Sequence, residues 1–365
     1  MTTQMQGPAG AVTLINGRAF DYFCGCGYLG LQRHPAVLAA AVEALAQYGL
    51  STATSRGGYG EHPVYEELEK QARLTLGCER LLYFASGYMG AAILVQSALQ
   101  ARDHFFLDES AHFSLWDAAA MSNRAVSSFR HLNAGSLAAC LKAELQPGEH
   151  PLLLTDGLFP ISGEIAPLPE YLEVLRRWHG HLIVDDAHAL GVLGAHGRGS
   201  LEHFGLSGED CLSTATFNKA LGGFGGCIAG STALINSLEQ NSRIFIGSSP
   251  PPLPAAAASA RALQVLREEP ALLDALHQNV SRLRAGLRKI GWKVEEGPSP
   301  VMCLQGSGKM NLLQVRDRLF AQGIAVEYVT SYPSAPPGGG LRLAVFATHT
   351  TEQIERLLKE LRAAL

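Results

Sequence analysis

The segment Thr214-Ala-Thr-Phe-Asn-Lys-Ala-Leu-Gly-Gly-Phe-Gly-Gly226 places one lysine, Lys219, between a hydroxyl-bearing stretch and a glycine-rich turn. The β-branched residues of Leu212 to Thr216 predict a strand that ends near this lysine. A lysine amine is a poor nucleophile at its ordinary pKa, but it forms Schiff bases when it is desolvated. Because a lone lysine is more often a solvated charge, the flanking motifs must decide between these interpretations. This combination suits a covalent aldehyde cofactor with a phosphate tail.

Composition limits the class of protein. A chain of 365 residues can form one large domain and a smaller one. The net charge of -4 and the absence of a Lys/Arg block exclude nucleic acid as an expected partner. The first residues do not resemble a secretory signal, and no apolar run is long enough for a membrane span. The seven scattered cysteines indicate a reduced, cytoplasmic protein.

Apolar, β-like runs alternate with helical patterns over the first two thirds of the chain. This order is typical of a mostly parallel sheet with helices on both faces. The expected strands are Leu81 to Phe84, His104 to Leu107, Leu152 to Thr155, Leu182 to Asp185 and Leu212 to Thr216. The expected helices are Pro35 to Tyr48, Gly87 to Gln100 and Pro169 to Trp178.

The sequence pattern changes at the proline-rich run of residues 250–254, where an alanine-rich helix and a long charged helix follow. We expect a smaller α/β domain to begin there. The predicted organisation is an N-terminal arm and helix over 1–50, a large cofactor-binding domain over 51–250 and a small domain over 251–365. The strands expected in the small domain are Trp292 to Glu295, Val301 to Leu304, Ile324 to Val326 and Leu341 to Phe346.

Ligands of open parallel sheets bind at the carboxyl ends of the strands, and polar motifs fall there. Ser86-Gly87-Tyr88 follows one strand and opens a helix, so it could bind a phosphate or simply cap the helix. Asp185 could face the ring nitrogen of pyridoxal phosphate, with His112 and His188 near the ring. A metal site at Asp185, Asp186 and His188 is the weaker alternative, because no second ligand cluster accompanies them. No metal is therefore predicted.

Many ordered motifs together resemble the α-oxoamine synthase family of fold-type-I pyridoxal-phosphate enzymes. They cover nearly the whole chain and include Tyr28 to Pro35, Ser55-Arg56, Ser86 to Tyr88, Asp108, His112 to Ser114, Phe129 to His131, Asp156 to Phe159, Gly163 to Leu168, Asp185 to His188, Gly197 to Gly199, Thr216 to Lys219, Pro251-Pro252, Leu341 to Leu343 and His349-Thr350.

The resemblance implies a role for each matched residue. Lys219 would bind the cofactor covalently and later move the Cα proton. Asp185 would pair with the ring nitrogen, His112 would stack on the ring and His188 would contact its phenolic oxygen. The phosphate contacts would come from Ser86, Gly87, Tyr88 and Thr216.

The resemblance also implies a second subunit and an amino-acid site. Ser248 stands where the family usually has a threonine that reaches the phosphate of the neighbouring subunit, which implies a homodimer. Arg342 would clamp the amino-acid carboxylate, a role that suits a bidentate guanidinium. Cys26 replaces an asparagine that the family places close to the substrate. Pro160 replaces a serine near the cofactor, and Tyr65 and Ala91 replace a histidine and an asparagine.

We therefore expect an acyltransferase that condenses a small amino acid with an acyl-CoA, with or without decarboxylation. An aminotransferase on the same scaffold is the first alternative, since no motif decides where Lys219 delivers the proton. A non-catalytic partner subunit is the second alternative, and the retained Lys219, Asp185 and His112 argue against it.

Overall fold

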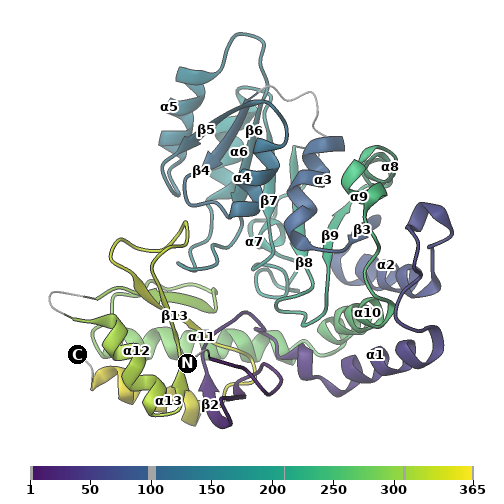
Figure 1. Ribbon diagram of the computed structural model, residues 1–365. Helices are drawn as coiled ribbons and strands as arrows, with labels where there is room; N and C mark the ends of the chain where they lie inside the picture. Colours follow the sequence, from purple (N-terminus) through teal and green to yellow (C-terminus); the bar gives the residue numbers. More distant parts are fainter. Residues whose placement is uncertain (1–2, 98–103, 209, 307–309, 364–365) are drawn as a thin grey trace.

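The computed structural model describes residues 3–97, 104–208, 210–306 and 310–363. Its centre is a seven-stranded sheet in the order β3-β9-β8-β7-β6-β4-β5 (Figure 1). Within this sheet only β9 runs antiparallel to its neighbours, so the predicted mostly parallel α/β sheet is confirmed. The strands are β3 Arg80–Phe84, β4 His104–Asp108, β5 Ala125–Phe129, β6 Pro151–Asp156, β7 His181–Asp185, β8 Cys211–Thr216 and β9 Gly226–Gly230.

Helices cover both faces of this sheet because its central strands are apolar on both sides. On β6, Leu152 and Leu154 pack against α3, whereas Leu153 packs with α5 and α6 on the opposite face. The helices up to the small sheet are α1 Pro35–Tyr48, α2 Pro63–Leu76, α3 Gly90–Ser97, α4 Phe113–Ala120, α5 Ala134–Glu144, α6 Leu168–Arg176, α7 Ser200–Phe204, α8 Thr232–Asn241, α9 Arg243–Gly247, α10 Leu253–Glu268 and α11 Ala271–Lys289. Among the described residues, no helix combines the length and apolar character needed to cross a membrane.

The C-terminal part carries a second, antiparallel sheet in the order β10-β13-β12, beside α11 and α13 (Figure 1). A third small sheet joins the two ends of the chain, since β2 pairs with β11. The N-terminal strands thus lie against the C-terminal part. These elements are β1 Val12–Ile15, β2 Arg18–Tyr22, β10 Val301–Leu304, α12 Leu312–Ala321, β11 Ile324–Ala325, β12 Glu327–Val329, β13 Gly340–Ala344 and α13 Thr351–Arg362.

Most predicted elements are present, with differences in one strand, in one helix and in several strands that were not predicted. Trp292 to Glu295 is not a strand, so that prediction was wrong: the Trp292 N–H bonds back to the end of α11, and the Glu295 carbonyl accepts from Arg284. The helix expected over Gly87 to Gln100 begins with a 3-10 turn and is α-helical from Gly90, while its expected end at Gln100 lies outside the described residues. The strands β1, β2, β5, β9 and β12 were not anticipated. The boundaries between domains remain a prediction.

Candidate active site

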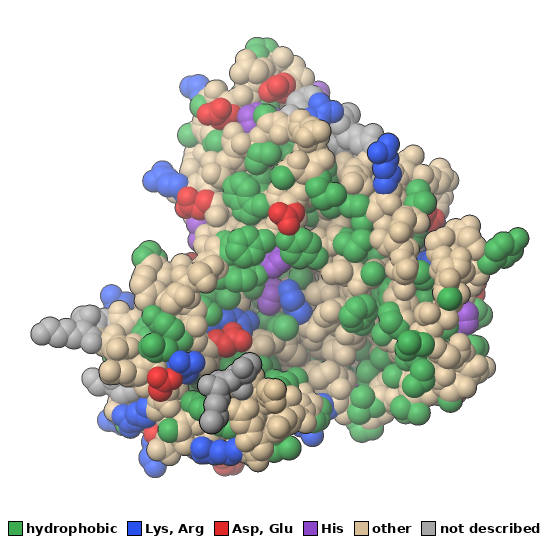
Figure 2. All heavy atoms as spheres, viewed as in Figure 1, with side chains coloured by type: hydrophobic (Ala, Val, Ile, Leu, Met, Phe, Trp, Pro, Cys, Tyr) green, Lys and Arg blue, Asp and Glu red, His purple; other side chains and the backbone are tan. Residues whose placement is uncertain are grey.

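The carboxyl ends of three neighbouring strands bring the central residues of the site together. Asp156 ends β6, Asp185 ends β7 and Thr216 ends β8, with Lys219 in the turn that follows. His112 precedes α4, just after β4. Figure 2 shows this face hollowed between the upper and lower parts of the molecule, with histidine and basic side chains gathered in the hollow.

Asp156 and Asp185 form a buried carboxylate pair. The sequence predicted a role for Asp185, whereas Asp156 was only a member of a motif. The two residues are direct partners in the β6–β7 register. Burial, followed by the charge of Asp185, raises the pKa of Asp156 well above its ordinary value. The raised pKa favours the protonated form of Asp156, and its Oδ2 accepts a hydrogen bond of 2.8 Å from the His112 N–H.

His112 is held as a neutral imidazole. Its Nδ1 accepts from the Ser114 N–H at 3.2 Å and lies 2.8 Å from the Ser114 hydroxyl. Burial lowers the pKa of His112, against the opposing effect of Asp185. The ring also lies near Tyr88 and Tyr332, with centroid distances of 5.9 Å in both cases. Tyr332 was missed by the sequence analysis, because it comes from a loop of the C-terminal part.

Lys219 is half-buried, and burial lowers the pKa of its amine despite the nearby Asp185 carboxylate. A larger neutral fraction makes this amine a better nucleophile at neutral pH than a solvated lysine. Its electrostatic neighbours include Asp156 and Cys26. Burial raises the pKa of the Cys26 thiol, so the residue that replaces the family asparagine is a protonated thiol.

His188 and Asp186 have different hydrogen-bond partners. The Tyr28 hydroxyl and His188 Nδ1 share a buried hydrogen bond of 2.7 Å. Burial, and then the charge of Lys219, lower the pKa of His188 well below its ordinary value. Asp186 is instead bound to Ser200, whose hydroxyl and N–H donate to it at 2.5 and 2.9 Å. In the part of the chain that the structure covers, no group of three or more His, Cys, Asp or Glu could hold a metal ion.

The predicted phosphate residues meet at the start of the 3-10 turn Gly87–Met89. The Ser86 hydroxyl accepts from the Tyr88 N–H at 3.3 Å and so caps this turn. A Cβ on Gly87 would lie 2.7 Å from the Thr216 Cβ, which no side chain could tolerate. Glycine therefore lets the start of this turn lie directly against Thr216, and a turn that begins beside a threonine hydroxyl suits a phosphate. Together with the Lys219 amine and a buried carboxylate, these residues fit pyridoxal phosphate.

Ser248 lies apart from these residues, just after α9. Its hydroxyl donates to the Ile244 carbonyl at 2.5 Å, and the residue lines a cavity with Arg56, Ile246 and Pro250. Its predicted contact with a phosphate involves a neighbouring subunit and stays a prediction.

Arg342 is buried, and most of its guanidinium N–H groups donate hydrogen bonds to other residues of the chain. Nε donates to the Pro160 carbonyl at 2.7 Å, while Nη1 and Nη2 both donate to the Gly25 carbonyl at 3.1 and 3.2 Å. Nη1 also contacts a Glu327 carboxylate oxygen at 3.0 Å. Four of the five guanidinium N–H groups thus have acceptors within the chain. The bidentate contact with an amino-acid carboxylate, which the resemblance implies, stays a prediction.

The other departures from the family pattern have structural roles. The Tyr65 side chain is fully buried and its hydroxyl donates to the Pro251 carbonyl at 2.7 Å. Ala91 is buried in the apolar cluster between α3 and the sheet. Pro160 contributes its carbonyl to Arg342, which any residue could supply.

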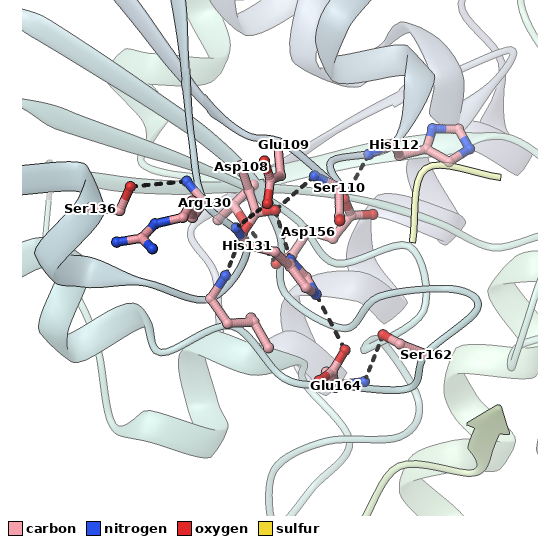
Figure 3. A network of polar contacts seen from close by, with 12 residues as sticks. Asp108, Glu109, Ser110, His112, Arg130, His131, Ser136, Asp156, Ser162 and Glu164 are labelled. Atoms are coloured by element: carbon pink, nitrogen blue, oxygen red, sulfur yellow. Dashed lines mark hydrogen bonds and ion pairs between the residues drawn. The ribbon is translucent and has the colours of Figure 1, made fainter. Parts of the chain in front are cut away.

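A charged network supports the edge of the site (Figure 3). His131 donates from Nδ1 to Asp108 at 2.7 Å and from Nε2 to Glu164 at 3.2 Å. Burial alone would lower the pKa of His131, but the hydrogen bonds to Asp108 and Glu164 raise it to about 9. His131, Asp108 and Glu164 all lie in motifs of the sequence, but only the fold brings them together, so their pattern predicted no role for them.

Comparisons with known proteins bear on this site. The family described as aminotransferase class I and II matches residues 24–361. The 8-amino-7-oxononanoate synthase of Nitrosococcus oceani is 34% identical over 98% of this chain and 94% of its own length. The enzyme of the same name from Methylococcus capsulatus is 37% identical over 99% of this chain and 93% of its own length.

Solved structures show the same architecture. A serine palmitoyltransferase from S. paucimobilis with bound PLP superposes with a TM-score of 0.92 at 26% identity, covering 100% of this chain and 92% of that one. A serine palmitoyltransferase from Sphingomonas wittichii gives the same TM-score and identity over the same shares.

Proposed function

Because this chain belongs to the α-oxoamine synthase family, within the class I and II aminotransferases, we propose that it joins a small amino acid to an acyl-CoA. It is a transferase that depends on pyridoxal phosphate. The observation that carries the proposal is Lys219 beside the buried Asp156–Asp185 pair, at adjoining strand ends. This is the residue set that an aldehyde cofactor with a basic ring nitrogen requires.

The names of the relatives indicate the class of product. An 8-amino-7-oxononanoate is an α-aminoketone, in which a methyl group follows the carbon that bears the amine. Such a carbon skeleton matches alanine after loss of its carboxylate, joined to an acyl group at Cα. For this chain we propose a small amino acid such as alanine, an acyl thioester, and an α-aminoketone, carbon dioxide and coenzyme A as products.

When bound, pyridoxal phosphate supplies an electron sink for the carbanion at the amino-acid Cα. The Lys219 amine would hold the cofactor aldehyde and, once released from it, would take the Cα proton. The charged Asp185 would keep the ring nitrogen protonated, and the neutral His112 would pack on the ring. Ser86, Gly87, Tyr88 and Thr216 would hold the phosphate.

We also propose a homodimer that works in the cytoplasm. The helix α1 supports this proposal, because Leu38, Val42 and Leu45 share one helical face and are 50%, 66% and 50% exposed. Contiguous exposed apolar residues of this kind are typical of an interface. In a homodimer, Ser248 of each subunit would contact the phosphate of the other.

Two measurements test the function. The first follows thiol release from acetyl-CoA and longer acyl-CoAs with glycine, alanine and serine, and we expect one amino acid to support it. The second follows the cofactor absorbance with amino acids and keto acids. Conversion to the pyridoxamine form without thiol release would instead establish an aminotransferase. The Lys219→Ala variant, expected to be inactive, is the control for both measurements.

A further inference from the structure

Glu327 is the residue that this fold places opposite Arg342. The strands β12 and β13 are antiparallel, and their register pairs Glu327 directly with Arg342. The two side chains form an ion pair of 3.0 Å. The Arg342 side chain is 5% exposed, whereas that of Glu327 is 42% exposed. The carboxylate therefore covers a buried guanidinium from the side open to solvent.

The three acceptors of Arg342 differ in how easily they can leave. Gly25 and Pro160 accept through main-chain carbonyls, which cannot move without their segments. Glu327 accepts through a rotatable side chain that is 42% exposed, so it can turn toward solvent without moving the main chain. An incoming carboxylate thus gains a nitrogen of Arg342 at the lowest cost by displacing Glu327 from Nη1.

The charges of Arg342 and Glu327 also indicate that Glu327 competes with an incoming carboxylate. Burial alone would lower the pKa of Arg342, but its neighbours Tyr28 and Glu327 raise it, so the guanidinium stays protonated. Glu327 already compensates this single positive charge. A second carboxylate bound at the same guanidinium would face Glu327 as a like charge, which disfavours binding.

We propose that Glu327 is a specificity-determining residue that occupies the Arg342 nitrogen needed by the amino-acid carboxylate. This inference rests on the proposed function and on the role that the family resemblance implies for Arg342, which is to bind the amino-acid carboxylate. Glu327 lowers the affinity for α-amino acids in their carboxylate form, and it lowers the affinity for neutral analogues, such as amino-acid amides, much less. The enzyme consequently discriminates weakly between an amino acid and its amide.

The test measures binding without any acyl thioester, so that it stays independent of acyl transfer. Protein loaded with pyridoxal phosphate is titrated with alanine and with alaninamide, and the cofactor absorbance gives each Kd. We expect Glu327→Gln to bind alanine about 10-fold more tightly, or about 1.4 kcal/mol, and to change alaninamide binding less than about 3-fold. Glutamine keeps the size of the side chain and removes its charge, and a thermal melt checks the fold.

Two further variants sharpen the test. Glu173→Gln, in an exposed ion pair with Arg177 on α6, should leave both affinities unchanged. In an Arg342→Gln background, Glu327→Gln should no longer favour alanine. The inference is overturned if Glu327→Gln leaves alanine binding equal or weaker, if alaninamide gains as much, or if neither protein binds alanine at all. Failure of thiol release alone would count against the proposed function and not against this inference.

Discussion

Asp156 and Asp185 face each other across β6 and β7, as directly paired residues at the last position of each strand. Both are buried, and burial beside a second carboxylate raises the pKa of Asp156. Adjacent buried carboxylates resist carrying two charges together, so we expect Asp156 to keep its proton and Asp185 to be the one that faces the cofactor.

This division predicts unequal effects of two matched substitutions. Asp185→Asn removes the charge proposed to face the ring nitrogen, and we expect kcat for thiol release to fall by about 100-fold or more. Asp156→Asn replaces a protonated carboxyl with an amide that can still accept from the His112 N–H, so we expect a loss below about 10-fold. Equal losses in steady-state kinetics would contradict the division of roles.

The homodimer leads to a second prediction. Val42→Glu places a charge in the exposed apolar face of α1, and we expect it to shift the mass measured by light scattering from dimer to monomer. Leu313→Glu, at an exposed leucine of α12, is the matched control and should remain dimeric. A dimeric Val42→Glu protein would show that α1 lies outside the interface.

The sequence predicts those site residues that lie at the ends of recognisable strands, and it does not predict contacts that depend on how distant strands pair. Lys219, Asp185 and His112 each follow a strand with a clear apolar pattern, so a parallel sheet is enough to gather them. Glu327 has no such signal: it precedes Arg342 by fifteen positions, and only the β12–β13 register brings the two together. The motif around Arg342 likewise carries no signal for the Gly25 and Pro160 carbonyls, which accept hydrogen bonds from its guanidinium.

The same reasoning explains the errors in the secondary structure. The strand β9 consists of Gly226-Cys-Ile-Ala-Gly230, which has little intrinsic β-propensity, and pairing with β3 and β8 defines it. Trp292 to Glu295 has a strand-like pattern, yet Arg284 takes the Glu295 carbonyl that a partner strand would need. Tertiary contacts decided both cases.

Close packing between α3 and β8 gives a third prediction. A Cβ on Gly90 would lie 1.7 Å from the Thr214 hydroxyl oxygen and 2.8 Å from its Cβ. We expect Gly90→Ala to lower the free energy of unfolding by about 3 kcal/mol, measured by urea denaturation, because the strand cannot move away. Adding Thr214→Ala should recover part of this loss.

Gly135→Ala is the control, since Gly135 is an exposed glycine in helix α5 and a new Cβ there meets only ordinary contacts. Alanine favours the helix, so this variant should be as stable as the parent or slightly more stable. An equal loss in both variants would attribute the effect at Gly90 to something other than the Thr214 contact.

The network around His131 gives a prediction about pH. Hydrogen bonds to Asp108 and Glu164 outweigh burial and raise the folded-state pKa of His131 to about 9, from an unfolded value near 6.5. A raised pKa stabilises the fold fully below the unfolded pKa, and this stabilisation is lost as the pH rises through the folded pKa. The same imidazole lowers the pKa of Glu164, whose contribution is lost only as the pH falls through that lowered value.

His131→Gln removes the ionisation, so its destabilising effect should be large at and below pH 6.5 and should fall away as the pH rises through about 9. Relative to the parent, we expect a deficit about 2 kcal/mol larger at pH 6.5 than at pH 9.5, measured by urea denaturation at each pH. His196→Gln, in an exposed pair with Glu202, should show little dependence on pH because solvent screens it. A deficit that stays constant between pH 6.5 and pH 9.5 would mean that His131 supports the Glu164 segment by its shape and hydrogen bonds and not by its charge.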